Sequence, residues 1–196
     1  MRYIIVSFLG FITLASFAQD STATNQLEPL TIAYEYQKWE DFRSYEGKFR
    51  VLIPGAVSTK EQTLETGVGE LTYHTAYCEL KDKNADNLVY IISYCDYPDG
   101  GMHSDSTELL GEFFAATMEG AAASVEGAVV YEQTRDFREY PGRVWRVDYL
   151  EGKAVIKTRA FLVGNRFYSL QTITTKERSL NRSSERFFSS FRLFGG

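Results

Sequence analysis

The stretch RVWRVDYLEGKAVIKTRAFLVGNRFYSLQTIT, residues 143–174, decides the fold of this chain. Two dipeptides, Glu151-Gly152 and Gly164-Asn165, divide it into three runs that are predicted as strands: 143–150, 153–163 and 166–174. Both dipeptides suit two-residue hairpin turns, where positive φ angles are needed. The stretch therefore predicts three consecutive antiparallel strands.

The two turns also predict which residues lie opposite each other. The first turn pairs Arg146 with Lys157 and Val144 with Arg159, and the second pairs Arg159 with Leu170. Because side chains alternate between the two faces of a sheet, one face of these strands is predicted to be the core. Its members are Trp145, Val147, Tyr149, Ile156, Leu162, Phe167 and Ile173.

The opposite face is predicted to be exposed and to carry a basic and aromatic patch. Its members are Arg146, Lys157, Arg159, Phe161, Tyr168 and Leu170. Like charges that cluster on a sheet destabilise it unless a negative group lies among them. Asp148 on the same face is one such group, and a bound anion or an acidic partner is another; neutralisation by local carboxylates is the simpler interpretation. The candidate ligand-binding residues are therefore Arg146, Lys157, Arg159 and Tyr168.

The rest of the chain extends this sheet and adds two helices. Further strands are predicted at 48–53, 58–65, 70–80, 87–97 and 128–137. Helical spacing of apolar residues predicts a helix at 105–124 and a closing helix at 176–190. The predicted fold is α+β: an antiparallel β-sheet with a central crossover helix and a C-terminal helix packed on it.

Four short patterns carry a resemblance to a known family. They are Phe49-x-Val51-x-Ile53-Pro54, Asp96-Tyr97-Pro98 before the helix, GNRFYSL at 164–170, and FFSSF at 187–191. Together they resemble the PsbP-like proteins, which include extrinsic subunits of photosystems and small exported bacterial proteins of unknown role. The resemblance covers about residues 45–194. It implies a fold and no activity, because that fold hosts mostly non-catalytic accessory proteins.

The N-terminal segment is predicted to be a signal peptide. Arg2 precedes an apolar run at 4–14, and Ser16 and Ala18 occupy the positions that a signal peptidase reads. A membrane anchor is the competing interpretation, but a spanning helix needs about 20 apolar residues. We expect residues 1–18 to be removed, 19–30 to be a flexible leader, and 31–196 to form a single globular domain. The mature protein is predicted to be periplasmic or extracellular.

Charge limits the partners. The net charge of the whole chain is −5, whereas nucleic acid and anionic membranes need an excess of Lys and Arg. No other stretch is long and apolar enough for membrane insertion. The predicted partner is an extracytoplasmic protein or an anionic ligand, and the oligomeric state stays open.

The two cysteines are predicted to remain unpaired. Export favours a disulfide, but a hairpin across 81–86 would place Cys78 opposite Tyr90. Cys95 then lies five residues further along, or about 16 Å away on the opposite face. A disulfide requires Cα atoms within about 7 Å.

The two histidines give no firm metal or catalytic site. His74 would lie opposite Tyr94 and is predicted to be a hydrogen-bonded structural residue. His103 shares a loop with Asp96, Asp99 and Asp105, where a weak metal site competes with a simpler solvated turn. We therefore predict no metal site and no cofactor.

The sequence has no recognised catalytic motif. A nucleophile elbow, an HExxH motif and a glycine-rich phosphate loop are all missing from it. We therefore predict a non-catalytic binding or accessory module rather than an enzyme. The alternative is a hydrolase of unrecognised type that acts on cell-envelope or extracellular material.

Overall fold

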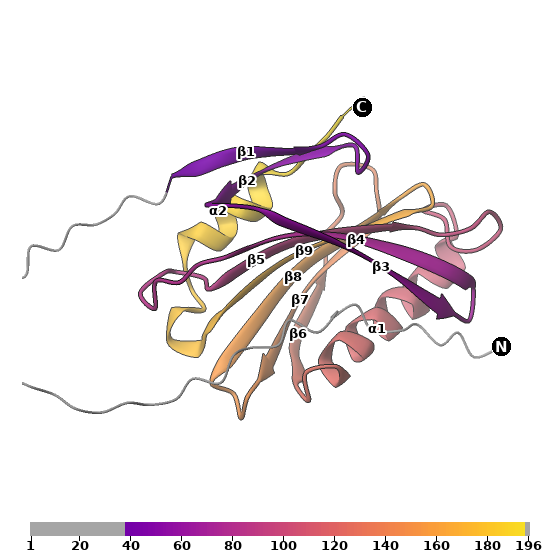
Figure 1. Cartoon of the computed structure of the whole chain (residues 1–196). Helices are drawn as coiled ribbons and strands as arrows, with labels where there is room; N and C mark the ends of the chain where they lie inside the picture. The colour runs from indigo at the N-terminus through magenta and orange to yellow at the C-terminus, as the bar shows by residue number, and fades with distance from the viewer. Residues whose placement is uncertain (1–37, 195–196) are drawn as a thin grey trace, which may run out of the picture.

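The computed structural model describes residues 38–194, and a seven-stranded antiparallel sheet forms its centre (Figure 1). The strands, in spatial order, are β3 (Ser58–Thr66), β4 (Gly69–Glu79), β5 (Val89–Asp96), β9 (Arg166–Thr175), β8 (Ala154–Val163), β7 (Gly142–Tyr149) and β6 (Ala128–Thr134). The strands predicted from residues 143–174 are β7, β8 and β9. The segments predicted as a signal peptide and a leader lie outside the described residues.

The predicted register is confirmed at both turns, but the first turn spans the four residues 150–153 rather than two. Glu151 and Gly152 have φ angles of +56° and +78°, and the N–H of Lys153 donates to the carbonyl of Leu150 at 3.0 Å. As predicted, β7 pairs with β8 through Arg146 and Lys157. The same agreement holds between β8 and β9. Local turn chemistry therefore sets the centre of the sheet.

One face of the sheet packs against α1 (Thr107–Ala123), which follows β5 in the chain and precedes the edge strand β6. Three strands, β9, β8 and β7, lie between β5 and β6. Phe113 on α1 meets Phe167 on β9 with ring centroids 5.4 Å apart in a T-shaped contact. Trp145 and Leu162, predicted as core, are buried on this face. We call it the first face.

The second face is also covered, contrary to the prediction that it is exposed. A small sheet of β1 (Trp39–Ser44), β2 (Phe49–Pro54) and β10 (Arg192–Leu193) lies over it beside α2 (Arg182–Ser190), as Figure 1 shows. Phe161, Tyr168 and Leu170 are 1%, 2% and 0% exposed. Phe191 joins the layers through ring contacts at 5.6 Å with Phe49 and 5.0 Å with Phe161. The protein therefore has a hydrophobic core on each face of one sheet.

The closing helix is shorter than predicted. A single 3-10 turn, η1 (Lys176–Arg178), comes first, and α2 begins only at Arg182. The side chain of Asn181 accepts a hydrogen bond from the N–H of Ser184 at 2.8 Å and so caps α2. Leu180 falls within the predicted helix but precedes this cap, and it is 90% exposed.

The cysteines lie in different cores. Cys78 pairs with Tyr90 in the predicted register, and its thiol donates to the carbonyl of Pro54 on the second face. Cys95 is buried in the cluster on the first face. Both thiols are free. Among residues 38–194, no helix has the length and apolar character required to cross a membrane.

Candidate functional site

Charged side chains gather on the second face on either side of the covering layer. We call Arg135, Arg146, Lys157 and Arg159, on and beside β6–β8, the basic flank. We call Glu46, Glu61 and His74, around β3 and β4, the acidic flank. Both flanks include side chains that lie next to the buried aromatic residues of the second core. Each flank therefore places charged side chains where part of the surrounding water is excluded.

The basic flank is built by strand alternation. Lys157 and Arg159 are two residues apart on β8, so their side chains share a face. Arg146 lies opposite Lys157 on β7. The guanidinium carbon of Arg159 is 5.8 Å from the centre of the Phe137 ring, which stacks on Phe161 with centroids 4.6 Å apart. Arg159 therefore lies at the edge of the second core.

Arg146 already has an acidic partner. Its Nε and Nη2 atoms donate to the two oxygens of Asp148 at 2.5 and 3.0 Å. Lys176 approaches the same carboxylate at 3.3 Å. These hydrogen bonds, led by Arg146, lower the pKa of Asp148. Asp148 therefore neutralises Arg146, as one interpretation of the sequence allowed, but within residues 38–194 it forms no ion pair with Lys157 or Arg159.

Lys157 and Arg159 are the unneutralised part of the basic flank. Within residues 38–194 neither makes an ion pair or a side-chain hydrogen bond, and the Nε atom of Arg159 is buried without a partner. Burial lowers the pKa of both side chains. Arg146 lowers the pKa of Lys157 further and Arg135 that of Arg159, while Glu185 on α2 opposes both shifts. Lys157 and Arg159 therefore keep positive charge that Glu185 offsets only in part.

Tyr168 does not belong to this site, which corrects its prediction as a ligand-binding residue. The side chain is 2% exposed, and its hydroxyl donates to the carbonyl of Gly47 at 2.7 Å. The small sheet covers the ring, so a ligand on the basic flank does not meet it. The structure brings together Arg146, Lys157 and Arg159 from the predicted set.

Arg135 is the basic residue that the sequence did not reveal. It directly follows β6, and its N–H donates to the carbonyl of Gly142 at 3.1 Å. The register of β6 shifts between Val129 and Tyr131, so counting back from a turn does not place Arg135. The glycine at position 142 was the one hint in the sequence, because it lets the Arg135 backbone lie close to β7. A Cβ atom at Gly142 would lie 2.6 Å from the Arg135 carbonyl.

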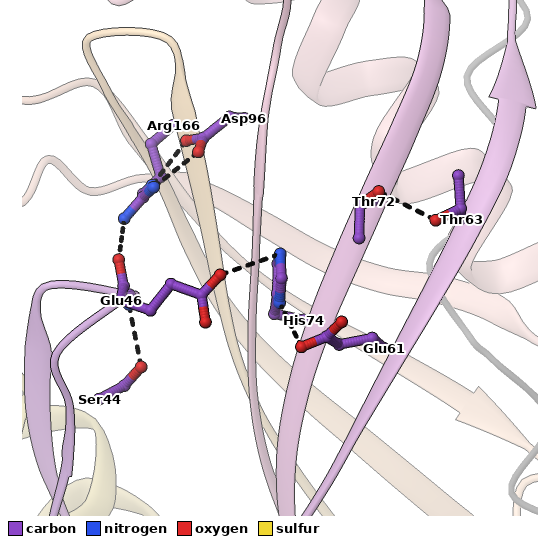
Figure 2. Close-up of polar contacts among 9 residues, drawn as sticks. Ser44, Glu46, Glu61, Thr63, Thr72, His74, Asp96 and Arg166 are labelled. Atoms are coloured by element: carbon purple, nitrogen blue, oxygen red, sulfur yellow. Dashed lines mark hydrogen bonds and ion pairs between the residues drawn. The ribbon is translucent and has the colours of Figure 1, made fainter.

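The acidic flank joins three elements (Figure 2). Glu46 lies in the turn between β1 and β2, Glu61 on the edge strand β3 and His74 on β4. His74 pairs with Tyr94 in the predicted register, and their rings stack with centroids 4.6 Å apart and an interplanar angle of 7°. Its Nδ1 atom is 3.3 Å from a Glu61 oxygen and its Nε2 atom 3.8 Å from a Glu46 oxygen. The pairing of His74 with Tyr94 is therefore confirmed, whereas its role as a hydrogen-bonded structural residue stays a prediction.

The His103 loop does not gather the acids considered for a metal site. His103 lies 3.4 Å from Asp105, but Asp96 is held by Arg166 at the end of β5. Among the described residues, Glu46, Glu61 and His74 form the group that could hold a metal ion, with ligand atoms within 4.8 Å of one another. The sequence did not predict this group because no local pattern connects its three elements.

The sequence matches no protein-family model and no curated protein. The structure is similar to the solution structure of cyanobacterial PsbP (CyanoP) from Synechocystis sp. PCC 6803, with a TM-score of 0.54 and 11% sequence identity. That match covers 87% of this chain and 98% of the cyanobacterial one. A protein of unknown function from Pseudomonas aeruginosa matches at a TM-score of 0.34 and 10% identity, over 71% of this chain and 85% of that one. The first likeness confirms the PsbP-like fold and, at this identity, shows the fold alone.

Proposed function

We propose that the protein is an exported, soluble, non-catalytic accessory module that binds an anionic group on its basic flank. The observation that carries the proposal is the state of Lys157 and Arg159: two half-buried cations without an ion-pair partner among the described residues. The signal peptide predicted at residues 1–18 supports the exported location.

Burying a charge is unfavourable unless an opposite charge accompanies it. The burial that lowers the pKa of Lys157 and Arg159 therefore destabilises the free protein while both groups are charged. A bound anion at the guanidinium would offset this cost. A charge-assisted hydrogen bond contributes about 1.5–3 kcal/mol. The basic flank is thus better suited to a complex than to the free protein.

The chemistry of the flank favours a carboxylate or a phosphate. A guanidinium can donate two parallel hydrogen bonds to either group, and Lys157 adds a positive charge beside it. Glu185 on α2 lies close enough to influence both cations, so it could be displaced by, or compete with, an incoming anion. The group could belong to an extracytoplasmic partner protein or to a small anionic ligand.

The test is a calorimetric titration of the purified protein with each of two probes, inorganic phosphate and a hexaglutamate peptide. We expect at least one probe to bind, and Arg159→Ala to weaken that binding by about tenfold or more. Added salt should weaken it further, though less than for fully exposed charges, because the Debye length is about 10 Å at 0.1 M and partly buried pairs are screened less. Lys153→Gln is the matched control, since it removes one exposed positive charge from the same hairpin. The proposal fails if neither probe binds, or if Arg159→Ala binds as the wild type does.

The hydrolase alternative remains a second prediction from the sequence. No specific arrangement in the described residues favours it over the binding module. Turnover of ester or cell-wall substrates by the purified protein would revive it.

A further inference from the structure

The acidic flank lies across the second face from the basic flank and is independent of the function proposed above. Its three side chains converge from separate elements, as Figure 2 shows: Glu46 reaches His74 from the small sheet, and Glu61 reaches it from the large sheet. The flank therefore bridges the two layers of the protein at one point.

The imidazole of His74 is held in a defined orientation. It stacks almost parallel on Tyr94, and its side chain is only 21% exposed. Its two nitrogens face two different carboxylates, Nδ1 toward Glu61 and Nε2 toward Glu46. A ring that is fixed in this way loses little conformational freedom when it coordinates an ion.

The two carboxylates lack a permanent cation. Within residues 38–194, neither Glu46 nor Glu61 forms an ion pair with a lysine or an arginine. The nearest arginine, Arg166, uses its guanidinium on Asp96 and on the backbone carbonyl of Glu46. Two negative side chains therefore converge on one imidazole without a fixed positive charge to balance them.

We propose that Glu46, Glu61 and His74 bind a divalent transition-metal ion of the Zn²⁺ class. Zn²⁺ takes nitrogen and oxygen ligands at about 2.0–2.2 Å, which requires ligand atoms about 3–4 Å apart. The ligand atoms present here lie within 4.8 Å of one another. Only one imidazole nitrogen can bind the ion, so one carboxylate must move to the side of that nitrogen. Glu46 and Glu61 are 68% and 67% exposed, so their side chains can rotate to do this and to close the remaining gap.

The donor set also determines which ions fit. An imidazole suits zinc, copper, nickel and iron, whereas Mg²⁺ and Ca²⁺ prefer sites made only of oxygen. Two carboxylates and one imidazole leave further coordination positions for water or for a group from a partner. The bound ion would join the turn between β1 and β2 to the β3–β4 hairpin, so it would stabilise the contact between the layers.

The test is calorimetric titration of the untagged protein with ZnCl₂, with CaCl₂ and MgCl₂ as comparison ions. We expect saturable binding of Zn²⁺ and no comparable binding of Ca²⁺ or Mg²⁺. His74→Gln should abolish the binding, and Glu46→Gln and Glu61→Gln should each weaken it by about tenfold or more. Glu70→Gln is the matched control, because it removes one exposed negative charge from the same β3–β4 hairpin.

A second measurement keeps the result interpretable if His74→Gln alters the fold. Zn²⁺ should raise the thermal midpoint of the wild type and of Glu70→Gln, but not that of Glu46→Gln or Glu61→Gln, whose side chains are mostly exposed. The proposal is overturned if Zn²⁺ does not bind, or if the Glu46 and Glu61 variants bind it as tightly as Glu70→Gln does.

Discussion

Arg166 on β9 and Asp96 on β5 face each other at the end of the large sheet, and the guanidinium donates a 2.6 Å hydrogen bond to each carboxylate oxygen. Its Nη1 atom donates to the carbonyl of Glu46 at 2.7 Å, so the same side chain also holds the turn of the small sheet. The guanidinium lies 4.9 Å from the centre of the Tyr94 ring. Hydrogen bonding to Asp96 raises the pKa of Arg166, which keeps it charged. Arg166 therefore connects the two layers beside the acidic flank.

Replacement of Arg166 by Gln should destabilise the protein by about 1–2 kcal/mol. Hydrogen bonds to charged groups contribute about 1.5–3 kcal/mol, and the half-exposed Asp96 places this pair at the lower end. Urea denaturation measures the change. Lys153→Gln, which breaks the fully exposed contact with Glu151, should leave the midpoint unchanged. An Arg166→Gln protein as stable as Lys153→Gln would show that the layers do not depend on this contact.

Alkaline pH should destabilise the fold through its buried tyrosines. Burial raises the pKa of Tyr90 and of Tyr94 to about 12. In the unfolded chain a tyrosine loses its proton near pH 10, so above that pH the folded state binds more protons than the unfolded state. Stability should therefore be fully present below pH 10 and fall as the pH rises toward 12. Unfolding midpoints measured across this range check the direction; a midpoint that does not decrease would contradict it.

The domain should fold with two free thiols. Cys78 and Cys95 lie on opposite faces, and burial raises the pKa of each thiol, which makes both less reactive. We expect slow labelling by a thiol reagent in the native state and two labelled thiols after denaturation without reductant. A protein that gains two thiols only on reduction would refute the β4–β5 register.

Replacement of Gly142 by Ala should cost about 1–3 kcal/mol. A Cβ atom there would lie 2.6 Å from the Arg135 carbonyl and 2.9 Å from the Ala160 carbonyl, and backbone cannot yield as a side chain can. The variant should also bind anions more weakly, because separation of these segments moves Arg135 away from Arg159.

Gly111→Ala provides the control for Gly142→Ala. Gly111 lies in α1, and a Cβ atom there would have no neighbour within 4 Å. In a helix interior this change should stabilise the protein by about 0.5–1 kcal/mol. Equal effects of the two substitutions on thermal unfolding would show that crowding at Gly142 is unimportant.

The last of these predictions concerns removal of the predicted signal peptide. If residues 1–18 are a signal peptide, the exported protein should begin at Gln19, because Ser16 and Ala18 mark the cleavage site. N-terminal sequencing and intact mass of the protein from the exported fraction measure this. Recovery of a chain that still begins with Met1 in a membrane fraction would refute both cleavage and release.

The central strands could be predicted because their turns are local. Gly152 and Gly164 have positive φ angles, and each turn fixes the strands on either side of it. Coverage of the second face was harder to predict, because β1 and β2 come from one end of the described chain and α2 and β10 from the other. The consecutive apolar residues at 160–163 were the available signal, since a strand buried on both faces does not alternate.

The two candidate sites were also predictable only where their residues lie within one sheet. Hairpin counting brought Arg146 and Lys157 together correctly, but it also included Tyr168, whose hydroxyl donates to the carbonyl of Gly47. Glu46 could not be predicted near His74, because their contact depends on how the small sheet docks on the large one. Register within a sheet follows from sequence more readily than contact between layers does.

The position of Phe191 has a consequence for the order in which the protein is assembled. Its ring contacts Phe49, Phe137, Phe161 and Tyr168, and β10 directly after it pairs with β2. Synthesis runs from the N-terminus to the C-terminus, so Phe191 and β10 are made after the other described elements, and the second core stays open until then. We expect a chain that stops at residue 181 to bind a hydrophobic dye that the full chain excludes. Addition of Phe191 and β10, and not the formation of the first hairpins, therefore sets the earliest moment at which the second core can close.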